Sequence, residues 1–257
     1  MNVDIEFLKK LAMEAGAYIK SKRPSSSEIE SKEGRGNFVT AHDKAVQAML
    51  YDSLKKEYPE CGFMGEEDET HCESLPEFCF IIDPIDGTAN FINGYGHSAV
   101  SIGYVEHGIK KAGVVYDPYL DELFYAELGK GAFLNGNPIH VSGHKLRDSI
   151  ILFGISPYYE GYGEKSFTML RKLYENACDL RNSGSAALDI CYVASGKTDV
   201  FFELRLSPWD YAAGGLILSE AGGVIKNCEG GEISLVKGGS VLCAGKENIE
   251  EIEALIL

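Results

Sequence analysis

Three short segments of the chain combine carboxylate side chains with turn-forming residues. They read Gly-Glu-Glu-Asp at 65–68, Asp-Pro-Ile-Asp-Gly-Thr at 83–88 and Pro-Trp-Asp at 208–210, and none of them contains histidine or cysteine. Ligand sets made only of oxygen suit hard cations such as Mg²⁺, Mn²⁺ or Ca²⁺ and disfavour zinc. The three segments are therefore candidates for one shared cation site.

The central segment favours chemistry on a phosphate. A short apolar run predicts a buried strand that delivers Asp83 at its end, and Asp86 follows on the same short loop. Gly87 and Thr88 would then begin a helix whose free amide groups point outward, which is a natural seat for a phosphate. Metal and phosphate on one loop indicate metal-assisted transfer of a phosphoryl group to water.

Each acidic residue also has a purely structural interpretation. Asp86 could cap the helix that follows it. Asp43 and Asp210 each stand three residues after a threonine or serine, which is the spacing of a capping box. Glu66 could be a solvated surface charge, and Glu203 could be a salt-bridge partner. Taken one residue at a time, these alternatives stay open.

The elements that must position these acids follow from apolar periodicity. Spacings of three and four predict helices over 4–22 and from Thr40 onward, with a polar loop over 25–37 between them. Residues 98–141 predict a meander of antiparallel strands joined by local turns, including an Asn-Gly turn at 135–136. After residue 142, strands and helices alternate. The strands are expected at 150–155, 198–203 and 240–244, and the helices near 164–176, 185–195, 208–221 and 247–256.

These patterns predict a mixed α and β protein, in the α/β class, with two packed halves. At 257 residues the chain is long enough for one large domain or two modest ones. Residues 1–142 would form an α+β half that has an antiparallel sheet and most of the acids. Residues 143–257 would form an α/β half that carries Glu203 and Asp210. No flexible linker separates them.

The charge balance excludes several classes of partner. The chain has 39 acidic and 24 basic residues, for a formal net charge of −15. Such a charge repels nucleic acid and anionic membrane surfaces. No apolar run approaches the ~18–20 residues of a membrane span, and no signal peptide is visible. The seven cysteines form no CxxC pair, which indicates a reducing compartment and a cytoplasmic protein.

Jointly, the acidic segments resemble the inositol monophosphatase family of Mg²⁺-dependent, lithium-sensitive phosphatases. The family signature Asp-Pro-(Ile/Leu)-Asp-Gly-Thr-x-Asn-Phe stands at 83–91 and Gly-Glu-Glu at 65–67. Trp-Asp-x-Ala-(Ala/Gly)-Gly stands at 209–214, and Gly-Ser-Ala-Ala-Leu at 184–188 also fits. The motifs keep the order and distances of the family over essentially the whole chain. The resemblance implies a layered αβαβα sandwich.

The resemblance also implies a set of metal ligands. Glu66, Asp83 and the backbone carbonyl of Ile85 would hold a first Mg²⁺, for which Mn²⁺ is a possible substitute. Asp83, Asp86 and Asp210 would hold a second ion. Glu66 would also face a third, weaker and largely hydrated ion. The implied cofactor is thus two to three Mg²⁺ in one site.

Further roles carry over from the family to the residues around the metals. The amides of Gly87 and Thr88 would hold phosphate, and Lys32 would lie near the phosphate and the third metal. Thr88, hydrogen-bonded to Asp43, would help to orient or deprotonate the nucleophilic water. The substrate hydroxyls would meet four groups: Asp86, the Ala186 backbone, Glu203 and Asp210.

Two positions depart from the family pattern. Asp68 follows Gly-Glu-Glu where many relatives have serine or threonine, and residues 181–183 read Arg-Asn-Ser where many relatives carry two arginines. Neither position holds a metal ligand, so substrate orientation and the subunit interface are the properties affected. A tyrosine-dense loop over 158–163 is a hypothetical wall on the leaving-group side of the pocket. A surface or interface loop is its alternative.

The sequence supports three candidate functions, of which two are enzymatic and one is that of a binding protein. The first is hydrolysis of inositol 1-phosphate and related small polyol or sugar phosphates by metal-activated water. The second keeps that chemistry and changes the substrate to 3′-phosphoadenosine 5′-phosphate, fructose 1,6-bisphosphate or histidinol phosphate. The third is a regulatory binding partner of transcription or RNA machinery. The expected partners are a small phosphorylated substrate and a second copy of the chain in a homodimer, without direct nucleic acid or membrane contact.

Overall fold

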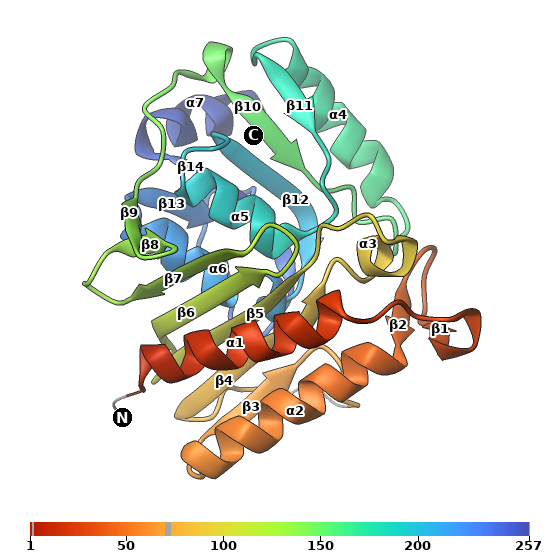
Figure 1. Cartoon of the computed structure of the whole chain (residues 1–257). Coiled ribbons are helices and arrows are strands. Elements are labelled where there is room, and N and C mark those ends of the chain that lie inside the picture. Colours follow the sequence, from red (N-terminus) through yellow and green to blue (C-terminus); the bar gives the residue numbers. More distant parts are fainter. Residues whose placement is uncertain (2, 70–72, 257) are drawn as a thin grey trace.

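The computed structural model describes residues 1, 3–69 and 73–256 and shows a layered α/β protein (Figure 1). Helices α1 and α2 cover one face of a seven-stranded sheet, and α5 and α6 lie between that sheet and a second, five-stranded one. Helices α4 and α7 cover the outer face of the second sheet. The order of layers confirms the αβαβα sandwich.

The seven-stranded sheet belongs to the N-terminal half. From β4 to β9 each strand pairs antiparallel with the next, which confirms the meander, while β3 pairs parallel with β4 and was not predicted. The strands are β3 (Gly62–Gly65), β4 (Phe78–Asp86), β5 (Ala99–Glu106), β6 (Ile109–Asp117), β7 (Glu122–Glu127), β8 (Ala132–Leu134) and β9 (Asn137–Ile139). Positive φ angles at Asn135 and Gly136 close the last hairpin.

Helices α1 (Ile5–Lys20) and α2 (Ala41–Glu57) confirm the two helices predicted in this half. Leu8 and Leu50, from their apolar stripes, are fully buried in the core over the sheet. The prediction of a loop between these helices is partly wrong. Residues 29–31 form strand β1 (Ile29–Ser31), which pairs with β2 (Phe38–Thr40) in a small ribbon.

The five-stranded sheet belongs to the C-terminal half and has the order β11-β10-β12-β14-β13. The strands are β10 (Ile150–Phe153), β11 (Asp179–Arg181), β12 (Val200–Leu206), β13 (Gly223–Lys226) and β14 (Gly239–Gly245). The helices are α4 (Tyr162–Tyr174), α5 (Ala186–Ala194), α6 (Pro208–Glu220) and α7 (Lys246–Ile256). The predicted helices are all present, whereas the short strands β11 and β13 were missed.

Helix α6 approaches the first sheet closely because both surfaces are built from small residues. A Cβ atom added at Gly113 of β6 would lie 2.7 Å from the carbonyl oxygen of Ala213, and one added at Gly103 of β5 would lie 3.1 Å from the Ala212 Cβ. This contact seats the start of α6, and with it Asp210, against the N-terminal sheet. A boundary between separate domains near residue 142 stays a prediction.

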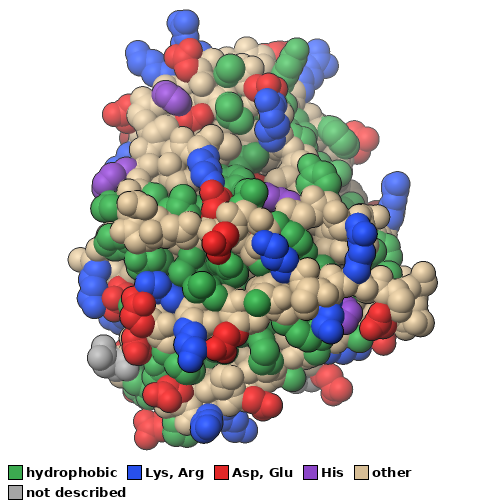
Figure 2. Space-filling view, viewed as in Figure 1, with side chains coloured by type: hydrophobic (Ala, Val, Ile, Leu, Met, Phe, Trp, Pro, Cys, Tyr) green, Lys and Arg blue, Asp and Glu red, His purple; other side chains and the backbone are tan. Residues whose placement is uncertain are grey.

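Within the residues that the structure describes, no helix is both long and apolar enough to cross a membrane. On the face seen in Figure 2, acidic and basic side chains are interspersed over the surface rather than gathered by sign. Six cysteines of the described chain are free thiols, and Cys72 lies outside it.

Candidate active site

A cavity of about 440 Å³ lies where the two halves of the chain meet. Its wall combines the predicted acids with parts of the β1–β2 ribbon, the start of α5, the loop after β10, and the end of β12. The volume falls within the range of small-molecule sites, roughly 300–1,000 Å³. The predicted site residues that line it are Glu66, Asp83, Asp86, Gly87, Thr88, Ala186, Glu203 and Asp210.

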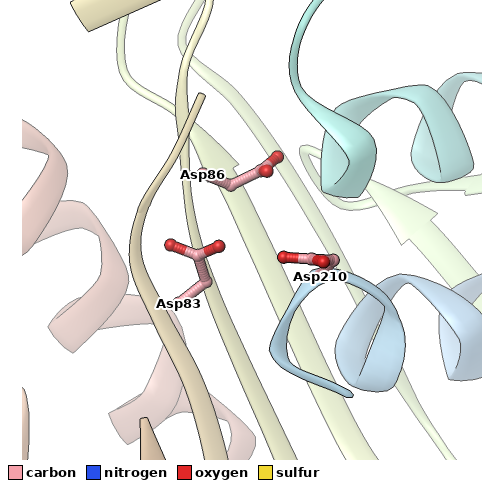
Figure 3. A group of neighbouring side chains, drawn as sticks. All are labelled: Asp83, Asp86 and Asp210. Carbon is pink, nitrogen blue, oxygen red and sulfur yellow. The ribbon is translucent and has the colours of Figure 1, made fainter. Parts of the chain in front are cut away.

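Three carboxylates converge in this cavity. Asp83 and Asp86 come from β4, Asp210 comes from the first turn of α6, and Figure 3 shows their side chains pointing toward one another. One ligand oxygen from each residue lies within 4.8 Å of the other two. The structure therefore brings together, from positions more than a hundred residues apart, three of the predicted metal ligands.

An irregularity in the pairing of strand β4 determines where its two acidic side chains lie. We predicted a strand over 78–82 followed by a turn, but β4 continues to Asp86. Its pairing with β5 shifts register between Asp83 and Asp86, so the two side chains, three positions apart, reach the same side of the strand. The amide of Ile85 donates a hydrogen bond of 3.0 Å to Oδ1 of Asp83 and orients that carboxylate.

The three acids are electrostatically frustrated without a cation. Burial raises the pKa of Asp83 well above its usual range, and the charges of Glu66, Asp86 and Asp210 raise it further. Burial and then the charge of Asp86 likewise raise the pKa of Asp210. A bound cation would stabilise the charged forms of these buried, mutually repelling carboxylates. This oxygen-only cluster fits a hard divalent ion.

Asp86 is held differently from its two neighbours. Burial raises its pKa to about 6, although hydrogen bonds to its charged form lower the value. The Ser185 hydroxyl donates to its Oδ2, as does the amide of Ala187 at 2.9 Å. The first turn of α5 thus presents its amides to Asp86, and Ala186 lies beside them in the cavity wall.

Asp210 is a helix cap, and its position also leaves the predicted role as a metal ligand open. It forms the capping box of α6 with Ser207, whose amide donates to Oδ2 of Asp210 at 2.7 Å. The same side chain contributes an oxygen to the cluster with Asp83 and Asp86. The cap fixes the carboxylate in place, so the two interpretations support each other.

Thr88 begins α3 (Thr88–Asn93), directly after Gly87, whose φ of +88° suits glycine. Its hydroxyl lies 3.1 Å from Oδ1 of Asp43 and 3.2 Å from the carbonyl oxygen of Ile85. Asp43 is fully buried and forms the capping box of α2 with Thr40. The hydrogen bond between Thr88 and Asp43 is present, whereas their catalytic roles and a metal bond to the Ile85 carbonyl stay predictions.

Glu66 lies in the same cavity but outside the three-carboxylate cluster. The ammonium group of Lys32, from the β1–β2 loop, lies 3.1 Å from Oε1 of Glu66 and 2.7 Å from Oε1 of Glu67. Burial and the charge of Glu66 raise the pKa of Glu67 to about 7. We predicted no role for Glu67, although it stands in the Gly-Glu-Glu motif. Ligation of a metal by Glu66 stays a prediction.

Glu203 occupies another side of the cavity. Both the amide and the hydroxyl of Ser156 donate to its Oε1, at 3.1 and 2.9 Å. Burial raises its pKa to about 7, while these bonds lower it. Ser156 has a positive φ of 43° and was not predicted, because no local signal marks a loop residue that contacts a strand 47 positions later. Of the tyrosine-dense loop, Tyr158 and Tyr159 line the cavity.

One departure from the family pattern has a structural explanation. Asp68 accepts hydrogen bonds from the amide of Gly65, from Gln47 and from Tyr51, at 2.8–3.0 Å. It therefore ties the Gly-Glu-Glu turn to α2.

Asp189, for which we predicted no role, also lines the cavity and accepts a hydrogen bond of 2.5 Å from the Ser183 hydroxyl.

Comparisons with known proteins agree with this fold. A sequence model of the inositol monophosphatase family matches residues 2–256. The chain is 40% identical to Nus factor SuhB of Escherichia coli K12 over 212 residues, 82% of this chain and 79% of that protein. It is 37% identical to inositol monophosphatase 2 of Saccharomyces cerevisiae over 235 residues, 85% and 80% of the two chains. The solved structure of an IMPase from Thermotoga maritima superposes with a TM-score of 0.89 at 32% identity, covering 98% and 96%. The chain belongs to the inositol monophosphatase family.

Proposed function

We propose that the protein is a Mg²⁺-dependent phosphatase of inositol 1-phosphate and related small polyol or sugar phosphates. The observation that carries the proposal is the convergence of Asp83, Asp86 and Asp210 within 4.8 Å, in a cavity that Thr88 also lines, with its hydroxyl bonded to the buried Asp43. Family membership supports phosphatase chemistry, and the S. cerevisiae relative bears the name inositol monophosphatase.

The residues of the cavity divide the chemistry between them. Asp83, Asp86 and Asp210, with Glu66, would hold Mg²⁺, which when bound would neutralise the phosphate dianion and acidify water in the cavity. The Thr88 hydroxyl donates to Asp43, so its lone pairs are free to accept a hydrogen bond from a water molecule and aim it at phosphorus. The buried Asp43 carboxylate, fixed by Thr40, holds that hydroxyl in orientation.

The leaving-group side supports a polyol. Glu203 uses Oε1 for Ser156, which fixes the carboxylate in the cavity wall. Its other oxygen is a strong acceptor for a substrate hydroxyl. A ring that carries several hydroxyls, as inositol does, matches a wall of buried acceptors. Substrates without hydroxyls would leave these groups unpaired, which costs affinity.

The test is phosphate release from a panel of substrates, with and without Mg²⁺ and Li⁺. The panel contains inositol 1-phosphate, 3′-phosphoadenosine 5′-phosphate, fructose 1,6-bisphosphate and histidinol phosphate. We expect Mg²⁺-dependent, Li⁺-inhibited release, fastest from inositol 1-phosphate. A hundredfold preference for the adenosine bisphosphate would contradict the proposed substrate and would leave the proposed phosphatase reaction in place.

A second candidate function rests on the relatives called Nus factor SuhB, 40% identical to this chain. The protein could act in transcription by binding another protein, in addition to or in place of catalysis. Replacement of Asp83 by asparagine separates the two functions in cells. A deletion phenotype that Asp83→Asn fails to complement favours the enzyme, and full complementation favours the binding role.

We also propose that the protein is a cytoplasmic homodimer, as the family resemblance implies. Light scattering coupled to gel filtration tests the dimer, and a molar mass near that of one 28.1 kDa chain would contradict it. Cell fractionation tests the location.

A further inference from the structure

The catalytic cavity contains two cationic side chains among its described lining residues, Lys32 and Arg205, and only one of them is neutralised. Lys32 is paired with both Glu66 and Glu67. The side chain of Arg205 donates to the carbonyl oxygen of Gly238, and no ion pair with a carboxylate is found for it in the described part of the chain. A guanidinium without a carboxylate partner in a substrate cavity is available to an anion.

Arg205 is also held in place. Its guanidinium carbon lies 5.4 Å from the centre of the Tyr159 ring, a cation–π contact that limits its movement. The hydroxyl of Ser156 lies 2.9 Å from Oε1 of Glu203 and 3.1 Å from the Arg205 carbonyl oxygen, so its one proton is within reach of both acceptors. One loop residue therefore ties the loop after β10 to the strand that carries both Glu203 and Arg205, and two aromatic residues of that loop, Tyr158 and Tyr159, complete the wall.

The position of Arg205 separates it from the reacting phosphate. The amides that the family resemblance implies as phosphate ligands belong to Gly87 and Thr88, at the start of α3, whereas Arg205 lies on β12, two residues after Glu203. A substrate whose phosphate lies over Asp83 and Asp86 would therefore present its alcohol portion to Glu203 and Arg205. A guanidinium binds phosphate or carboxylate with two parallel hydrogen bonds, and this geometry selects such groups over neutral hydroxyls.

We infer that Arg205, backed by Tyr159, is a specificity-determining residue that binds a second anionic group, a phosphate or carboxylate, on the alcohol portion of the substrate. The inference rests on the proposed phosphatase function and narrows its substrate class. Among phosphates of the same sugar or polyol, the form that carries a second negative charge, remote from the phosphate that is removed, should therefore be the better substrate.

The test uses fructose 1-phosphate and fructose 1,6-bisphosphate, which differ only in the second phosphate. Their kcat/KM values are measured with Mg²⁺ at one ionic strength. The wild type should prefer the bisphosphate by about tenfold or more, mainly through KM, as expected for one charge-assisted contact. In Arg205→Gln that preference should fall close to one, and Arg205→Lys should keep part of it, because the charge remains and the planar fork is lost.

The matched control is Arg171→Gln, which removes an exposed arginine paired with Glu175 on α4 and should keep the wild-type ratio. Melting temperatures show whether each variant is folded. If Arg205→Gln melts far below the wild type, the salt dependence of the wild-type ratio decides: a ratio that falls with added salt supports the inference, and a constant ratio overturns it.

A further set of outcomes separates this inference from the function on which it rests. Phosphate release from both sugars without preference, or a preference that survives in folded Arg205→Gln, overturns the inference alone. No release from either sugar or from inositol 1-phosphate overturns the proposed function and the inference together.

Discussion

Replacement of Asp83 by asparagine should stabilise the protein without metal while removing its response to Mg²⁺. Asp83 is 2% exposed and shares its cavity with Asp86 and Asp210. Asparagine keeps the oxygen that accepts the bond from the Ile85 amide, so the local backbone should be retained. The substitution removes one of three mutually repelling groups and nothing that packs.

The magnitude follows from the separation of the carboxylate oxygens. Two full charges at most 4.8 Å apart repel by about 3.5 kcal/mol or more at an effective dielectric constant of 20. Because burial and the neighbouring charges raise the pKa of Asp83, the cluster keeps a proton to higher pH than a free aspartate does, and this proton relieves part of the repulsion. We expect the free energy of unfolding to rise by about 1–2 kcal/mol, or about 2–8 °C in melting temperature for a chain of this size.

Thermal unfolding in EDTA and in excess Mg²⁺ measures both effects. The gain in stability should be greatest at high pH. An acid whose pKa is raised by folding destabilises the native state only when the pH exceeds its pKa in the unfolded chain, about 4, and the destabilisation is complete above its raised pKa in the folded protein. Asp52→Asn, on the exposed side of α2, is the control for loss of one negative charge. A metal-free Asp83→Asn protein that melts many degrees below the wild type would refute this reasoning.

Three further predictions concern metal affinity, catalysis and specificity. Apparent Mg²⁺ affinity, measured by calorimetry, should rise between pH 6 and 8, because burial raises the pKa of Asp86 to about 6 and those of Asp83 and Asp210 are also raised; a flat profile would count against the cluster. Thr88→Val should lower kcat by about 10²-fold or more with little change in melting temperature, while Thr88→Ser keeps most activity; equal rates for the two variants would remove the hydroxyl from the mechanism. Glu203→Gln should reduce kcat/KM for inositol 1-phosphate more than for glycerol 2-phosphate, and an unchanged ratio would place Glu203 outside substrate recognition.

The fold could be predicted where apolar periodicity is long and uninterrupted. Helix α1 and the strands β5 to β7 bury repeated apolar positions, and the sequence shows them directly. The missed strands β1 and β11 have three residues each, Ile-Glu-Ser and Asp-Leu-Arg, and lie at sheet edges. Their pairing depends on the neighbouring strand rather than on their own side chains, so no local pattern marks them.

The site residues likewise divide into those that the sequence pattern reveals and those that only the fold brings together. Asp83 and Asp86 are adjacent in a motif and could be found from spacing alone, whereas Asp210 joins them through the packing of α6 on β5 and β6. The contacts of Ser156 with Glu203 and of Tyr159 with Arg205 bridge more than forty residues. Such contacts follow from tertiary packing, which a single sequence does not display.

The most direct test of the central claim is phosphate release from inositol 1-phosphate by the purified wild-type protein and by Asp83→Asn, each in Mg²⁺ and in EDTA. We predict turnover only for the wild type in Mg²⁺, with restoration when Mg²⁺ is added back after EDTA. Equal turnover in EDTA, or turnover by folded Asp83→Asn at the wild-type rate, would contradict a catalytic metal site formed by Asp83, Asp86 and Asp210.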